Sequence, residues 1–181
     1  MENKTSSNKV AIKWAAFYIV VSIVLTYVYQ FLKVDATSGI KYVAYIPFIA
    51  FLLLSLKEYK DQFNGGYLTF GEGFVTGLKY TIITSIVMGL FIYIYWTILS
   101  PQMYQQVIDK SREQMEAKGN MTSDQIDASM QYLTAGLLTI IATVFSIIGG
   151  IIISLIAAAI FKKERPPFTI DESVPYSDPT V

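Results

Sequence analysis

The sequence predicts an all-α integral membrane protein, a four-helix bundle with a short extramembrane helical hairpin between the third and fourth spans. Of its 181 residues, 53% are hydrophobic and only 15% are charged, whereas soluble domains carry about 25% charged residues. Four long uncharged runs divide the chain. A soluble bundle of four such helices would have too little polar surface to cover them, so these observations favour a membrane protein.

The composition also excludes several classes of function. Fourteen Lys and Arg residues balance fourteen Asp and Glu residues, so no overall field attracts nucleic acid, and we expect no nucleic-acid partner. The chain has neither Cys nor His, which removes thiol nucleophiles, imidazole acid–base chemistry and the commonest zinc ligands. We therefore expect no catalytic residues, no cofactor, no metal and no enzymatic activity.

The first two predicted spans cover about 14–32 and 40–57. The first holds 19 uncharged residues, close to the roughly 20 that cross a hydrocarbon core. It exceeds the apolar region of a signal peptide, which has about 7 to 15 residues, so we expect it to be retained. The second has only 15 uncharged residues, but Lys41 and Lys57 at its ends can extend their ammonium groups to the interface.

The third and fourth predicted spans cover about 78–99 and 133–161. Their uncharged runs of 20 and 29 residues are long enough to cross. Thr69 and Glu72 fit a capping box that would begin the third helix outside the membrane. We therefore interpret Glu72 as a cap rather than as a catalytic carboxylate.

The external segment 100–132 begins with a helix-start signal. Ser100 and Pro101 suit the N-cap and first helical positions. The polar helix that follows should end at Lys118, because Gly119 favours a left-handed C-terminal cap.

A second capping box then predicts the return helix of the hairpin. Thr122 fits the N-cap and Gln125 its partner, and we expect the helix to run unbroken from Ser123 into the fourth span. The external segment carries five acids and three bases. We interpret the acids as a solvated face, and attraction of a cation or a basic partner is the alternative.

The distribution of Lys and Arg predicts the orientation. With four spans, the N-terminal tail, the segment 57–79 and the C-terminal tail share one side, which holds nine of these residues against five on the other. Because such residues favour the cytoplasmic side, we expect both termini in the cytoplasm. We predict one transmembrane domain over 1–161 and a disordered cytoplasmic tail over 162–181.

Two rows of small residues predict a close helix–helix contact. In the third and fourth spans, small side chains recur every four positions, which permits the approach of another helix. The predicted packing residues are Gly73, Gly77, Ser85 and Gly89, with Thr81 in the same row, and Ala142, Ser146, Gly150, Ser154 and Ala158. The pattern leaves open whether the facing helix belongs to the same chain or to another subunit.

Several segments together resemble a known family. They are VAIKWAAFYIVVSIV near the start, YLTFGEGFVTGLKYT before the third span, Pro101 after it, and DKSREQMEAKGNMTSDQID before a Gly-rich fourth span. Over nearly the whole chain they resemble the family of domain of unknown function 4199. The resemblance implies a four-helix inner-membrane protein of Gram-negative bacteria, and it brings no established activity or catalytic residues.

The remaining features favour one function over another. No Asp, Glu, Lys or Arg lies well inside a predicted span, which argues against a charge-coupled transporter. We expect a non-enzymatic accessory or scaffold protein whose partners are the lipid bilayer and a second copy or another membrane protein. The alternative is a carrier or pore for a small neutral solute. A cavity lined by polar groups at membrane depth would discriminate between them.

Overall fold

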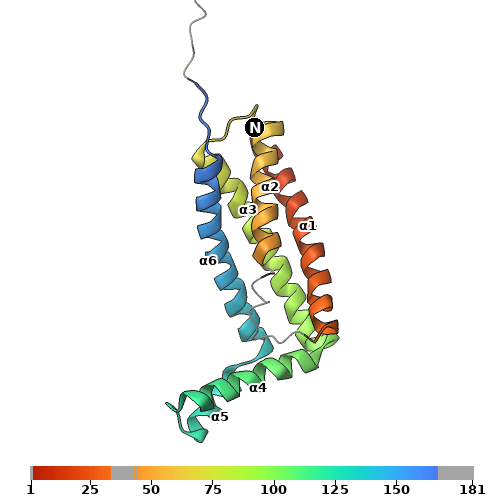
Figure 1. Cartoon of the computed structure of the whole chain (residues 1–181), viewed down its shortest axis with the longest axis vertical. Coiled ribbons are helices and arrows are strands. Elements are labelled where there is room, and N and C mark those ends of the chain that lie inside the picture. Colours follow the sequence, from red (N-terminus) through yellow and green to blue (C-terminus); the bar gives the residue numbers. More distant parts are fainter. Residues whose placement is uncertain (1, 34–42, 44, 167–181) are drawn as a thin grey trace, which may run out of the picture.

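The computed structural model describes residues 2–33, 43 and 45–166, and this part of the chain is helical apart from its turns and one isolated bridge. The elements are α1 (Glu2–Phe31), α2 (Tyr45–Glu58), the π-helix η2 (Tyr59–Phe63), α3 (Phe70–Ile94), the π-helix η3 (Tyr95–Leu99), α4 (Pro101–Lys118), α5 (Ser123–Tyr132) and α6 (Ala135–Phe161). Figure 1 shows α1, α2, α3 and α6 side by side in an elongated bundle, with α4 and α5 across one end. The predicted all-α class is confirmed.

Within the described residues, three helical segments are long and apolar enough to cross a membrane. They are Ser6–Phe31, Phe70–Leu99 and Ala135–Phe161. They cover the third predicted span and all but one or two residues of the first and fourth. Many of their large apolar side chains point outward, which suits contact with lipid rather than water. The length and composition of these helices therefore indicate that the protein is embedded in a membrane.

The second predicted span corresponds to a shorter helix. α2 has 14 residues, and η2 continues it for five more, but the continuation contains Lys60 and Asp61. Its uncharged part is therefore shorter than the other three. Residues 40–42 and 44 of the predicted second span lie outside the described residues.

Hydrogen bonds at both ends establish the directions of the helices. Ser7 and Thr76 bond through their hydroxyls at 2.9 Å near the starts of α1 and α3, and Gln30 bonds Ser100 at 3.0 Å near their ends. These two helices are therefore parallel. α6 runs the opposite way, so its C-terminus lies with the starts of α1 and α3. We call this the terminal end, and the end with α4 and α5 the hairpin end.

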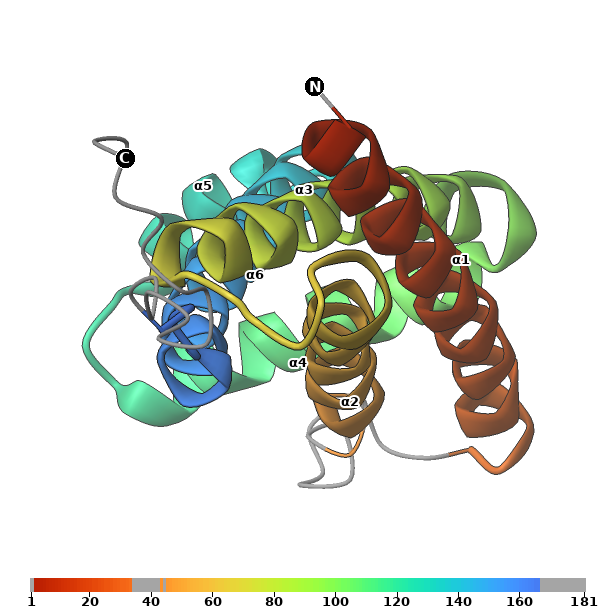
Figure 2. The same cartoon turned by 90° about the horizontal axis from the view of Figure 1, so that it is seen from above.

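A small buried core forms where α1, α2 and α3 meet. Leu52, Leu56 and Tyr80 are fully buried there, and the Tyr80 hydroxyl donates to the carbonyl of Phe48 at 3.1 Å. Viewed along the bundle, α2 lies between α1 and α6, and α3 runs along the other side (Figure 2). The short α2 thus joins the outer helices into one body.

The helix ends test the capping predictions. Both capping boxes, at Thr69 and at Thr122, are present as predicted. α4 also begins and ends where the sequence places it, with Gly119 at a φ of 63°. Ser100 stands at the N-cap position of α4 but makes no capping bond, because its hydroxyl accepts from Gln30.

The prediction of one unbroken helix from Ser123 into the fourth span is wrong. α5 ends at Tyr132, and Thr134 starts α6 as a new N-cap by accepting from the backbone N–H of Leu137 at 3.2 Å. This third cap lets the chain change direction between the hairpin and the bundle. The sequence predicts disorder for the tail over 162–181. Residues 162–166 are described, and there Lys163 forms a backbone bridge with Leu68, so the start of the predicted tail is held against the bundle. Residues 167–181 lie outside the described residues.

Candidate functional site: the α3–α6 contact and the hairpin

The most extensive contact in the bundle joins α3 to α6. Glycines make this close approach possible. A Cβ atom at Gly77 would lie 2.8 Å from the Ser154 hydroxyl oxygen, and one at Gly73 would lie 3.2 Å from the Ala158 Cβ. A Cβ at Gly150 would overlap the side chain of Thr81. The structure therefore brings the two small-residue rows together within one chain at the terminal half of the bundle.

Hydroxyl pairs bridge the same contact. Thr81 and Ser154 bond at 3.3 Å, and both side chains are fully buried. Ser85 and Ser146 bond at 3.0 Å, nearer the hairpin end. Because hydrogen bonds between helices in lipid are worth about 0.6 kcal/mol on average, these pairs add modestly to the packing of the glycines.

The two rows separate toward the hairpin end. There Gly89 lies against Thr143, the residue after the predicted packing residue Ala142. Ala142 itself is exposed. The α6 row leaves the contact after Ser146, whereas the α3 row, with the same four-residue spacing, stays in contact through Gly89. Sequence reasoning missed Thr139 and Thr143.

Two cavities flank Gly89 at this separation. The larger has a volume of about 360 Å³, and the smaller, of about 150 Å³, lies beside the Ser85–Ser146 pair. The larger is lined by Ile86, Gly89, Leu90, Tyr93, Gly136, Thr139, Ile140, Thr143 and Val144. The hydroxyls of Thr139 and Thr143 donate to backbone carbonyls of their own helix at 2.8 Å. The two threonine hydroxyls on these walls therefore already have partners.

The external hairpin is held together by its own contacts. Arg112 of α4 pairs with Asp127 of α5 at 2.6 Å, and the Tyr104 hydroxyl donates to the carbonyl of Leu133 at 2.7 Å. Ile126 is buried between the two helices. The hairpin is thus an ordered unit whose polar face is exposed.

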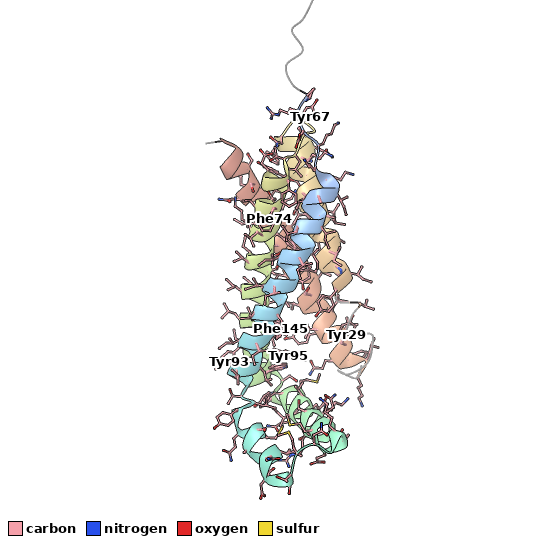
Figure 3. The ribbon with its side chains drawn as sticks, turned by 90° about the vertical axis from the view of Figure 1, so that its left-hand side faces the viewer. Tyr29, Tyr67, Phe74, Tyr93, Tyr95 and Phe145 are labelled. Carbon is pink, nitrogen blue, oxygen red and sulfur yellow. The ribbon has the colours of Figure 1, made fainter. Side chains whose placement is uncertain are left out.

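A second set of bonds attaches the hairpin to the bundle. The Tyr95 hydroxyl donates to the side-chain oxygen of Gln30 at 2.9 Å, and the amide of Gln30 donates to Ser100. Tyr95 lies near the hairpin end in Figure 3, on the stretch that leads into α4. Movement of α1 would therefore be transmitted to the start of the hairpin.

The acidic side chains do not form a metal site in the described part of the chain. Within residues 2–33, 43 and 45–166, no group of three or more Asp or Glu side chains could hold a metal ion. The prediction that Glu72 is a cap is confirmed, because its carboxylate accepts from the backbone and hydroxyl of Thr69 at 2.9 and 2.8 Å.

Comparison with known proteins identifies the family. The family model described as a protein of unknown function (DUF4199) matches residues 13–163. The chain belongs to this family. The match covers α3, α6 and the hairpin between them completely, and α1 from residue 13 onward. No curated protein and no solved structure matches the chain.

Proposed function

We propose that this DUF4199 protein is a four-span inner-membrane scaffold without enzymatic activity, which presents the α4–α5 hairpin to a membrane partner. The observation that carries the proposal is the continuity between the hairpin and the α3–α6 pair. Both ends of the hairpin join this pair, and Gln30 ties the hairpin to α1 as well. A surface held this firmly at the membrane boundary is suited to binding another protein.

The parallel course of α1 and α3 supports four crossings. If α1 crosses the bilayer, the chain must return before α3 can cross in the same direction. The only segment between them is 32–69, which contains α2 and η2. The Lys and Arg residues at the terminal end, where α1 begins and α6 ends, support an orientation with that end in the cytoplasm.

Photo-crosslinking tests the scaffold proposal. A photoreactive residue replaces Gln114 on α4 or Gln131 on α5, both exposed, and Ile152 on the lipid-facing side of α6 serves as the matched control. We expect one discrete protein adduct from the two hairpin positions and none from the control. The absence of hairpin adducts, or identical adducts at all three positions, would contradict the proposal.

The carrier alternative has less support, because the serine and threonine hydroxyls on the cavity walls are already bonded. It is tested by the efflux of small neutral solutes from proteoliposomes. We expect efflux at the rate of vesicles that contain no protein. Protein-dependent efflux that Ser146→Leu blocks would favour the carrier instead.

A further inference from the structure

Basic side chains gather at the terminal end of the bundle. Residues 2–13, 57–79 and 162–166 contain nine Lys or Arg and five Asp or Glu, a surplus of four positive charges. The hairpin end, over residues 32–33 and 100–132, contains four bases and five acids. Within these ranges the two ends carry net charges of opposite sign, and the three acids of residues 167–181 are not included.

Four of the eight bases whose side chains are described at the terminal end have a polar partner. Lys13 pairs with Glu58, which also accepts from the Trp14 indole at 2.7 Å. Lys162 pairs with Glu164 at 2.8 Å, and this hydrogen bond and charge lower the pKa of the Glu164 carboxyl, which keeps it ionised at neutral pH. Nearby carboxylates thus offset part of the positive charge at the terminal end.

Lys9 and three other lysines at this end have no ion pair with a carboxylate within the described part of the chain. The three others lie on the continuous segment of α2 and η2 and just after α6. The Lys60 ammonium lies 5.9 Å from the centre of the Phe161 ring, and the Lys163 ammonium lies 5.4 Å from that of Tyr67. Lys57 is exposed and makes no ion pair with Asp61, its nearest unpaired acid in sequence. We call Lys57, Lys60 and Lys163 the lysine triad. Aromatic rings orient two of these ammonium groups without neutralising them.

The lysine triad lies at the depth where lipid headgroups begin. Phe161 is the last residue of the apolar helix α6, and Lys60 sits over its ring. Lys163 follows two residues later and forms a backbone bridge with Leu68, which fixes its position. Nitrogen atoms surround the labelled Tyr67 at this end in Figure 3. Lys57 and Lys60, three residues apart on a helix, share a face.

We propose that the lysine triad binds the phosphate groups of anionic phospholipids in the leaflet at the terminal end. Ammonium groups near an anionic membrane surface each strengthen binding about fivefold, which corresponds to about 1 kcal/mol per lysine. Three such groups would give a preference for anionic over zwitterionic lipid on the order of 100-fold at low salt. Because the groups are near water, the preference should weaken as salt is added.

Native mass spectrometry of the purified full chain tests this proposal. The protein in detergent is titrated with phosphatidylglycerol and, separately, with phosphatidylcholine that has the same acyl chains. We expect the wild type to bind the anionic lipid more tightly and K57Q/K60Q/K163Q to lose this preference. K57R/K60R/K163R should retain it, because arginine keeps the positive charge. A control that removes equal charge from the hairpin end, K33Q/K110Q/K118Q, should retain it too.

Three further measurements make the result decisive. Each variant must unfold at the wild-type temperature in phosphatidylcholine. If the triple variant does not fold, Lys57→Gln alone should weaken binding of the anionic lipid about fivefold. Millimolar inorganic phosphate should not displace the lipid, and displacement would assign the surface to a soluble phosphate ligand. Equal affinity of the wild type for both lipids, or equal loss in the hairpin-end control, would overturn the proposal.

Discussion

Two adjacent glycines of α6 provide a direct test of the α3–α6 contact. Gly149 has no atom within 4 Å of the position that a Cβ would take, whereas a Cβ at Gly150 would overlap Thr81 and lie 3.1 Å from Cζ of Phe48. Replacing either glycine by alanine gains about 0.5–1 kcal/mol of helix propensity. The two changes therefore differ almost entirely in packing.

The expected magnitudes follow from this comparison. Gly149→Ala should raise the free energy of unfolding by about 0.5–1 kcal/mol. Gly150→Ala adds an overpacking cost of about 1–3 kcal/mol, so its free energy of unfolding should fall below that of Gly149→Ala by about that amount. Leucine at the same two positions should enlarge the difference. Thermal unfolding in detergent, followed by circular dichroism, measures all four variants.

A compensating change separates local overlap from general damage to the helix. Thr81→Ala removes the hydroxyl and methyl that the new side chain at Gly150 would meet, although it also removes the bond to Ser154. The double variant Gly150→Ala with Thr81→Ala should therefore be more stable than the sum of the single changes predicts. Equal effects of Gly149→Ala and Gly150→Ala, or strict additivity with Thr81→Ala, would refute the close contact.

Two further predictions concern the start of α3 and the topology. Thr69→Ala removes the two bonds between the Thr69 hydroxyl and Glu72 and should lower the free energy of unfolding by about 0.5–2 kcal/mol. Thr97→Ala, which loses only a bond to its own helix, should change it less in the same thermal assay. Because the chain has no Cys, single cysteines can report the orientation without background. An impermeant thiol reagent on intact cells should label Gln114→Cys and spare Gln62→Cys, and the reverse pattern would invert the proposed topology.

The helix ends that the sequence predicted correctly depend on local chemistry. The bonds between Thr69 and Glu72, and between Thr122 and Gln125, join residues only three positions apart. Gly119, which has a left-handed backbone conformation, likewise donates its backbone N–H to the carbonyl of Glu116 within the same turn. Such features need no knowledge of the rest of the fold, so residue identity and spacing are sufficient to locate them.

The break between α5 and α6 depends on a distant contact instead. The apolar spacing of Ile126, Met130 and Leu133 is the same for a continuous helix and for two helices that meet at an angle. In the structure, the Leu133 carbonyl accepts from the hydroxyl of Tyr104, 29 positions earlier in the chain. Spacing along α5 contains no information about that partner. The sequence therefore predicted a hairpin but not the direction in which it leaves the bundle.

The same limit applies within the membrane, where apolar side chains face both the core and the lipid. Hydrophobic periodicity then cannot distinguish the two surfaces of α6, and Gly149 and Gly150 are equivalent by composition. Small side chains and hydroxyl groups are then the features of the sequence that indicate the contact face. The predicted rows through Gly77 and Ser154 do meet across the contact. Every fourth residue of an ideal helix drifts by about 40° per step, yet the α3 row stays in contact through Gly89. The α6 row leaves the contact after Ser146, so Thr143, and not Ala142, faces Gly89. Predicting a membrane contact therefore requires the relative course of the two helices as well as the identity of their small residues.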